Sequence, residues 1–177
     1  LARMEAGRLQ VEVGEVDLSA VLNEVAATMA VQAREKYLDL YCPRIPEGVR
    51  VSADESRLRQ VFVNVIGNAI KFTPKGTVTI GLETPAGEPF VEVWVRDTGI
   101  GVGQEKMARL FHKFSQGDTS TTRKFGGTGL GLVIVKELVE MMGGSVRLES
   151  AGDGKGTLVT MRLARVAGRA PATGPSR

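Results

Sequence analysis

The chain has 177 residues, 42% of them hydrophobic and 24% charged, a composition typical of one compact globular domain. No apolar run approaches the roughly 20 residues that a membrane span needs, and one cysteine with one histidine excludes an internal disulfide and a typical structural zinc site. The formal net charge is +3, but Arg162, Arg165, Arg169 and Arg177 near the C-terminal end account for all of the excess, so we expect no nucleic-acid surface.

The first half of the chain predicts a helix, two strands and a second helix. Residues 16–37 place apolar side chains at helical spacing, and short strands follow over residues 37–41 and 49–54, around the turn PRIPEG. Residues 54–72 form the strongest helix, because their apolar residues make one continuous stripe and Asp54 is a suitable N-cap. A proline and a glycine follow the end of that helix.

The second half predicts one long helix among strands. The strands alternate apolar and polar residues and cover residues 78–82, 90–97, 145–150 and 156–163. The helix covers residues 131–142, and the looser stretch after Gly103 contains a short helical patch near residues 107–111. Helices interspersed with largely antiparallel strands predict an α+β fold, a two-layer α/β sandwich.

The two ends of the chain differ in kind from the body. Residues 1–13 predict the end of an upstream helix and a connecting segment, whereas residues 166–177, which are rich in small residues and proline, predict a disordered linker. We therefore expect one domain over residues 14–165.

Glycines cluster in the segment KFGGTGLGLVIV at residues 124–135, where a predicted helix begins. Such a turn offers backbone N–H groups to phosphate. The two familiar phosphate-loop patterns are absent, however, because the only Gly-Lys pair is followed by glycine, and the GxGxxG pattern fails at Leu132. The cluster by itself predicts no more than a structural turn.

Asp97 ends a predicted strand in the segment DTGIGV, where Gly99 and Gly101 permit close approach of the backbone. A carboxylate at this position suits an exocyclic amine such as that of adenine. An aspartate that caps its own turn is an equally good interpretation of this segment alone.

The helix over residues 54–72 carries an unusual polar face. Asn64 and Asn68 lie four residues apart, Lys71 continues their face, and Gly67 lies between them. Asparagine and glycine are poor choices inside a helix, so a functional site is expected there. Carboxamide oxygens suit Mg²⁺, which needs few protein ligands, and a lysine can meet phosphate charge.

Four segments together resemble the successive boxes of the ATP-binding catalytic domain of sensor histidine kinases. They are NVIGNAIKFT at residues 64–73, DTGIGV at 97–102, LFHKFSQ at 110–116 and GGTGLGL at 126–132. The resemblance runs from about Val13 to Arg165. It implies a Bergerat-type sandwich, with a mixed, mainly antiparallel sheet covered by helices on one face and a mobile ATP lid over roughly residues 103–128. The lid is similar to those of hybrid kinases, whose catalytic domain is often followed by a receiver domain.

The resemblance also implies roles for individual residues near bound nucleotide. It makes Asn64 and Asn68 the Mg²⁺ and phosphate residues and Lys71 a phosphate contact, with Asn64 and Lys71 as the catalytic pair. It makes Asp97 the adenine-binding residue. The implied nucleotide contacts further include Phe72 in the wall, Gly99 and Gly101 in the floor, and the stretch Gly127, Thr128, Gly129, Leu130 and Gly131 around the triphosphate.

Two pairs in the lid have competing interpretations. Phe111 and Phe114 resemble an aromatic pair that hinges the lid, whereas their spacing also suits simple core packing. Arg123 and Lys124 lie where lid cations reach phosphate, and a solvated charge pair is the alternative. Within the glycines, Gly126 and Gly127 are the expected hinge, so Gly129→Ala should weaken ATP binding more than Gly126→Ala.

Two departures from related patterns refine the expected activity. Clamp-type ATPases of this fold carry a glutamate four residues before the Mg²⁺ asparagine, but this chain has Asn64 there, so efficient hydrolysis is not expected. The only histidine, His112, is followed by Lys113 and is not expected to accept phosphate. The resemblance therefore implies donation of the γ-phosphate of Mg-ATP to a histidine on a separate dimerisation domain.

The partners implied are that dimerisation domain of the same parent chain and the receiver domain of a response regulator, with no nucleic acid. We expect the fragment to be monomeric and cytoplasmic, with a parent that is either soluble or anchored in the inner membrane. Two alternatives stay open: a nucleotide-binding regulatory module without phosphotransfer, and a clamp-type ATPase.

Overall fold

The structure is a computed structural model, and it describes residues 10–109 and 130–166. Its elements in chain order are β1 (Gly14–Asp17), α1 (Leu18–Glu35), β2 (Asp39–Tyr41), β3 (Arg50–Ala53), α2 (Glu55–Lys71), β4 (Thr77–Glu83), β5 (Phe90–Asp97), α3 (Gln104–Met107), α5 (Leu130–Met141), β6 (Ser145–Glu149) and β7 (Thr157–Ala164). Within these two ranges, no helix has the length and apolar character that a membrane span requires.

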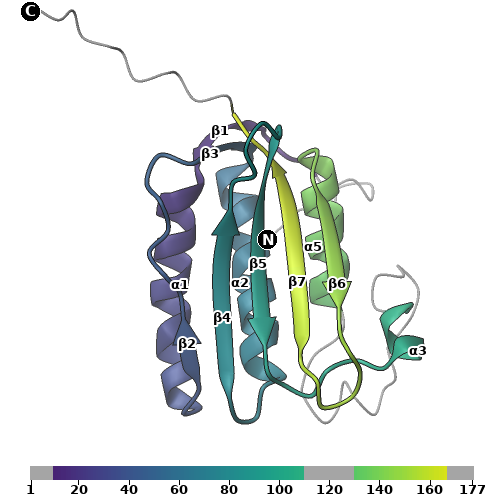
Figure 1. The fold of residues 1–177 in the computed structure, drawn as a ribbon. Coiled ribbons are helices and arrows are strands. Elements are labelled where there is room, and N and C mark those ends of the chain that lie inside the picture. Colours follow the sequence, from purple (N-terminus) through teal and green to yellow (C-terminus); the bar gives the residue numbers. More distant parts are fainter. Residues whose placement is uncertain (1–9, 110–129, 167–177) are drawn as a thin grey trace, which may run out of the picture.

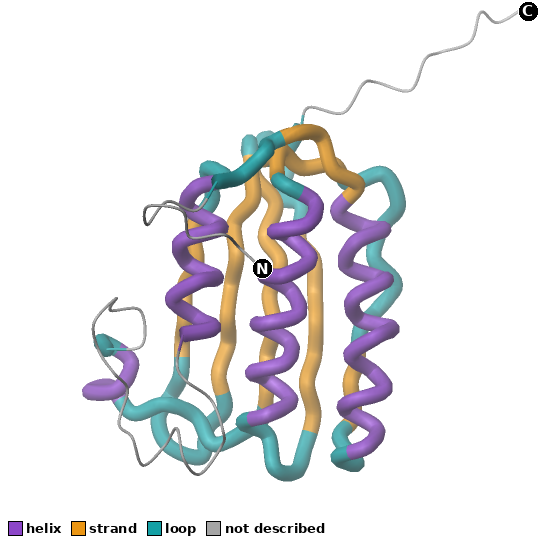
Figure 2. The backbone as a smooth tube through the Cα atoms, turned by 180° about the vertical axis from the view of Figure 1, so that it is seen from behind, coloured by secondary structure: helices purple, strands orange, loops and turns teal. Residues whose placement is uncertain are grey.

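The architecture has two layers. A five-stranded sheet runs in the order β2-β4-β5-β7-β6, with β2 parallel to β4 and the other neighbours antiparallel. Helices α1, α2 and α5 lie side by side over one face of this sheet, as the two opposite views show (Figure 1 and Figure 2). The predicted two-layer sandwich with a mixed, mainly antiparallel sheet is confirmed.

The apolar core lies between the sheet and the three helices. The middle helix, α2, contributes a stripe of buried residues that includes Leu58, Phe62 and Ile66, each fully buried. Burying side chains of this size stabilises the fold by about 1.5–3 kcal/mol each. The predicted cap is also present, since the Asp54 carboxylate accepts a hydrogen bond from the Arg57 N–H at 3.2 Å.

Two elements differ from the sequence-based expectation. Strand β1 was not predicted, and it pairs with β3 in a separate two-stranded sheet. It escapes periodicity analysis because it has four residues, of which only Val16 is buried. The short helical patch expected near residues 107–111 is α3, which begins earlier, at Gln104.

Two of the four C-terminal arginines, Arg162 and Arg165, belong to the folded body, and the Arg165 N–H donates to the Pro89 carbonyl at 2.9 Å. Arg162 lies in β7, where its Nε donates to the Glu92 carboxylate at 2.8 Å and its guanidinium lies 4.1 Å from the ring centroid of Phe90. Its charge is therefore balanced on the sheet surface.

Candidate functional site

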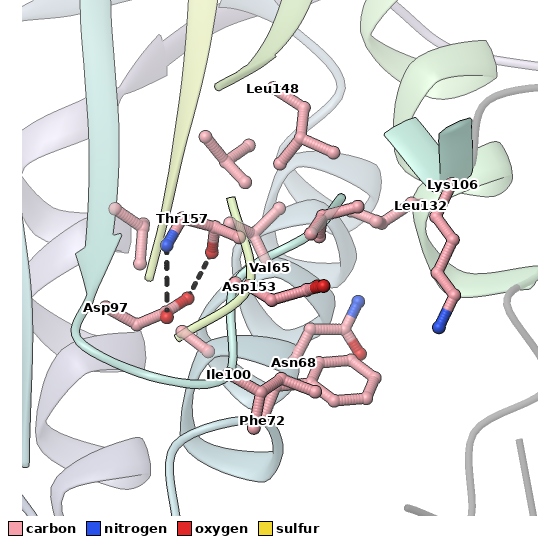
Figure 3. Close-up of a pocket in the computed structure, with 15 residues that line it drawn as sticks. Val65, Asn68, Phe72, Asp97, Ile100, Lys106, Leu132, Leu148, Asp153 and Thr157 are labelled. Atoms are coloured by element: carbon pink, nitrogen blue, oxygen red, sulfur yellow. Dashed lines mark hydrogen bonds between the residues drawn. The ribbon is translucent and has the colours of Figure 1, made fainter. Parts of the chain in front are cut away.

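A cavity of about 210 Å³ opens at one end of the sandwich, between α2, the inner face of β5 and β7, and the loop that follows β5. Figure 3 shows the side chains that line it. Most of its wall is apolar, and its polar lining residues are Asn68, Asp97, Lys106, Asp153 and Thr157. An apolar cavity with few polar groups is typical of a small-molecule site.

Asp97 is the last residue of β5 and is almost fully buried, with the residue 6% exposed. Three hydrogen bonds hold its carboxylate. Its Oδ1 accepts from the N–H of Gly99 at 2.9 Å and from the N–H of Thr157 at 3.3 Å. Its Oδ2 accepts from the Thr157 hydroxyl, and Figure 3 shows both bonds to that threonine. Because an ionised carboxylate has about four acceptor positions, Asp97 has capacity for one more donor.

The structure contains the turn-capping arrangement of the DTGIGV segment, whereas the contact of Asp97 with adenine stays a prediction. The hydrogen bond from the Gly99 N–H to Oδ1 of Asp97 is the turn-capping arrangement that the sequence offered as an alternative. At the same time Asp97 lines the cavity. The turn-capping bond thus holds the carboxylate at the cavity wall.

The last turn of α2 forms another wall of the cavity. Asn68 and Phe72 line it, and Phe72 is the C-cap residue of the helix, with its N–H donating to the Asn68 carbonyl at 2.9 Å. The beginning of α5 lies against this wall, because a Cβ on Gly131 would lie 3.5 Å from Nδ2 of Asn68. Two helix ends from opposite halves of the chain thus meet at Asn68.

The loop after Asp97 packs closely against its neighbours, and two glycines make this possible. A Cβ on Gly99 would lie 2.2 Å from the Phe72 carbonyl oxygen. Gly101 has φ +67, and its Cβ would lie 2.1 Å from the Gly152 carbonyl oxygen in the turn between β6 and β7. The glycines thus let this loop approach α2 on one side and the β6–β7 turn on the other, while their contact with nucleotide stays a prediction.

The structure brings together some of the predicted site residues and leaves others apart. Asn68, Phe72, Asp97 and Gly101 line the cavity. Asn64 and Lys71 lie on α2, as Asn68 does, but they do not line the cavity. The Lys71 ammonium lies 5.8 Å from the ring centroid of Phe72. Leu130 is the first residue of α5. The remaining residues predicted for the lid lie outside the described residues: Phe111, Phe114, Arg123, Lys124, Gly126, Gly127, Thr128 and Gly129.

Thr157, Asp153 and Lys106 are lining residues that the sequence analysis missed. Thr157 reaches the site because β5 pairs with β7 in a register that places it opposite Asp97. Asp153 reaches it from the β6–β7 turn, where its carboxylate oxygens would lie 3.6 and 3.8 Å from a Cβ on Gly103. The glycine-rich turn AGDGKG was a visible signal, but strand pairing cannot be read from one sequence.

Comparison with known proteins identifies the family. The family model described as "Histidine kinase-, DNA gyrase B-, and HSP90-like ATPase" matches residues 53–167. The signal transduction histidine-protein kinase BarA of Escherichia coli (strain K12) is 40% identical over 155 residues, which are 84% of this chain and 17% of BarA. Hybrid signal transduction histidine kinase D of Dictyostelium discoideum is 35% identical over 167 residues, 92% of this chain and 11% of that protein.

Solved structures give the same result. The full-length ShkA structure in complex with AMPPNP superposes with a TM-score of 0.74 at 34% identity, covering 94% of this chain and 34% of ShkA. The catalytic domain of histidine kinase ThkA superposes with a TM-score of 0.72 at 27% identity, covering 88% of this chain and 97% of that domain. The chain thus spans less than a fifth of the curated relatives named above but nearly all of a solved catalytic domain. It belongs to the family of histidine kinase-, DNA gyrase B- and HSP90-like ATPases and is of the type that forms the catalytic ATPase domain of histidine kinases.

Proposed function

We propose that this chain binds Mg-ATP in the cavity beside Asp97 and donates the γ-phosphate to a histidine on a separate dimerisation domain of its parent protein. The observation that carries the proposal is the Asp97 carboxylate, which is buried in an apolar cavity with capacity for one further donor. A buried charge without full partners is costly, so a ligand that supplies the donor gains affinity there.

The adenine base suits this end of the cavity. Its exocyclic amine is a donor, and its flat apolar faces match the side chains of Val95, Ile100 and Val159, which also line the wall. The carbonyl that guanine carries at the corresponding position is an acceptor and would face the carboxylate unfavourably. We therefore expect adenine nucleotides to bind more tightly than guanine nucleotides.

The phosphates suit the side of the cavity where Asn68, the beginning of α5 and the Lys106 side chain lie. The N-terminal end of α5 favours negative charge, and Lys106 adds a cation. Mg²⁺ fits this donor set, because it takes few protein ligands beside phosphate oxygens and water, and the Asn68 carboxamide oxygen is a suitable one. The ion would neutralise phosphate charge, while Asn68 would hold it in place.

The wider assignments belong to the same proposal. Strand β1 begins at Gly14 and β7 ends at Ala164, which supports a domain over residues 14–165 between an upstream helix end (1–13) and a linker (166–177). The proposed partners are the dimerisation domain and a receiver domain, and the hybrid kinase among the relatives supports the second. We propose a cytoplasmic location, where ATP is available.

Phosphotransfer in a mixture of separate parts tests the proposal. The chain is mixed with the separately produced dimerisation domain of its parent and ATP labelled at the γ-phosphate. We expect label on the dimerisation domain that is stable to base and labile to acid, as a phosphohistidine is. The same mixture with Asp97→Asn serves as the control and should give little label.

Two other results would point to the alternative functions. ATP binding without any labelled histidine would favour a regulatory nucleotide module. Steady release of inorganic phosphate by the chain alone would favour a clamp-type ATPase, against the expectation from Asn64.

A further inference from the structure

We propose that Ser150 is a positioning residue for the nucleobase end of the cavity, although it does not line the cavity itself. Ser150 follows β6 directly and begins the turn that leads to β7. The inference rests on the proposed function, because it concerns how the ATP site keeps its shape.

The Ser150 hydroxyl uses its full bonding capacity. Its oxygen accepts from the N–H of Val102 at 3.0 Å and from the N–H of Gly152 at 3.3 Å. It lies 2.7 Å from the Gly156 carbonyl oxygen and 3.3 Å from that of Gly152, so its single proton has the Gly156 carbonyl as the nearer acceptor. A hydroxyl has one donor and two acceptor positions, and all three are occupied here.

Through these bonds Ser150 links two segments that form the cavity. Val102 belongs to the loop after Asp97, which lines the cavity with Ile100, Gly101 and Val102. Gly156 immediately precedes Thr157, which bonds Asp97. One hydroxyl therefore joins the loop on one side of the nucleobase end to the strand that holds the carboxylate.

The other links between these segments are made by backbone alone. The N–H of Gly154 donates to the Ile100 carbonyl at 2.6 Å, and the N–H of Gly156 donates to the Gly99 carbonyl at 3.2 Å. Ser150 makes the third link, at Val102, where the loop turns toward α3 and the Lys106 side chain. Because this third link depends on a side chain, substitution can remove it while the backbone links stay.

Removing the hydroxyl should therefore loosen the far end of the loop more than the rest of the fold. Without Ser150 the Val102 N–H loses its partner, and the lining residues Ile100 and Val102 lose a fixed position against the base. A net hydrogen-bond contribution of this kind corresponds to roughly a tenfold change in affinity. The loss should fall chiefly on interactions with the base, because Ile100 and Val102 line that end of the cavity. Asn68 and the beginning of α5 are not involved, and α3, which carries Lys106 on the phosphate side, keeps its own backbone bond from the Met107 N–H to the Gly103 carbonyl.

The experiment compares ATP and GTP binding by calorimetry in the whole chain for wild type, Ser150→Ala and Ser150→Thr. We expect Ser150→Ala to lose roughly tenfold in ATP affinity with little change in the weaker GTP affinity, so that the ATP/GTP ratio falls by about the same factor. Ser150→Thr keeps the hydroxyl and should restore the ratio. Ser145→Ala, an exposed serine at the other end of β6, is the matched control and should behave as wild type.

A second measurement does not depend on any variant. Amide hydrogen exchange of the Val102 N–H in the nucleotide-free wild type should be slow if the Ser150 bond is maintained. Fast exchange at Val102 would overturn the inference. So would an ATP/GTP affinity ratio that Ser150→Ala leaves unchanged, whether both affinities stay the same or both fall equally. Failure of the wild type to bind ATP would instead overturn the proposed function. The two failures can be told apart, because the exchange of the Val102 N–H is measured without nucleotide.

Discussion

The contact between Gly101 and the β6–β7 turn gives a quantitative prediction for Gly101→Ala. The residue has φ +67, where alanine costs about 1–2 kcal/mol relative to an ordinary backbone conformation. Its new Cβ would in addition lie 2.1 Å from the Gly152 carbonyl oxygen, so the turn must move by about 1 Å to reach normal contact. Forcing such a contact apart typically costs about 1–3 kcal/mol, which gives a total of about 2–5 kcal/mol.

Gly87→Ala is the matched control for this substitution. Gly87 has φ +77, close to that of Gly101, but no heavy atom lies within 4 Å of its Cβ position. It should therefore cost only the conformational part, about 1–2 kcal/mol. The difference between the two variants isolates the close approach of the loop and the turn.

Urea denaturation followed by circular dichroism measures both free energies of unfolding, and calorimetry measures ATP affinity while each variant is folded. We expect Gly101→Ala to lose about 1–3 kcal/mol more stability than Gly87→Ala and at least about tenfold in ATP affinity. Gly87→Ala should keep the wild-type affinity. Equal stability losses in the two variants would refute the reasoning, because the clash would then have no energetic effect.

Three further predictions concern single side chains. Asp97→Asn should reduce ATP affinity by about 10- to 100-fold while the protein stays folded, because the amide group of asparagine is a donor where one carboxylate oxygen was an acceptor. Calorimetry measures the affinity, and an unchanged value would contradict the placement of the base. Lys36→Met should lower the free energy of unfolding by about 1 kcal/mol in urea titration, because the Lys36 ammonium donates to the Ile70 carbonyl at the end of α2 at 2.7 Å. No loss of stability would mean that water replaces this hydrogen bond fully. Burial raises the pKa of the Cys42 thiol, so the folded chain carries less thiolate at pH 8.5 than the unfolded chain. Iodoacetamide should therefore react more slowly with the folded chain, and equal rates would contradict this.

The helices could be predicted from the sequence because their signals are local. The stripe and cap of α2 lie within one segment, so the predicted range 54–72 and the observed Glu55–Lys71 agree closely. Strand β1 has no such signal, since a four-residue strand gains its stability from pairing with β3 and not from its own pattern. Its neighbour in space is more than thirty residues away in the chain, which periodicity does not report.

The same distinction explains which part of the candidate site was predicted. Asn68 was identified as an unusual residue type inside a helix, and Asp97 from its place at the end of a strand beside two glycines. Thr157 is an ordinary strand residue, and it matters only because the β5–β7 register places it opposite Asp97. Ser150 likewise acts through Val102, 48 residues away in the chain. A site residue whose role arises from pairing between segments leaves no local trace in one sequence.

Asn64 and Asn68 show what helical spacing alone does not predict, namely which residue of a pair lines the cavity. Their spacing places both on one side of α2, but of the two only Asn68 lines the cavity. The cavity is closed by the loop after Asp97 and by the beginning of α5, and both meet α2 at its last turn, where Asn68 and Phe72 lie. Asn64 lies one turn, about 5.4 Å, toward the other end of the helix. The cavity also reaches that turn, because Val65 lines it, so Asn64 lies beside the cavity and not beyond its depth. A role for Asn64 therefore requires a ligand that extends out of the apolar cavity to that residue, as the phosphates of a nucleotide whose base lies at Asp97 would do.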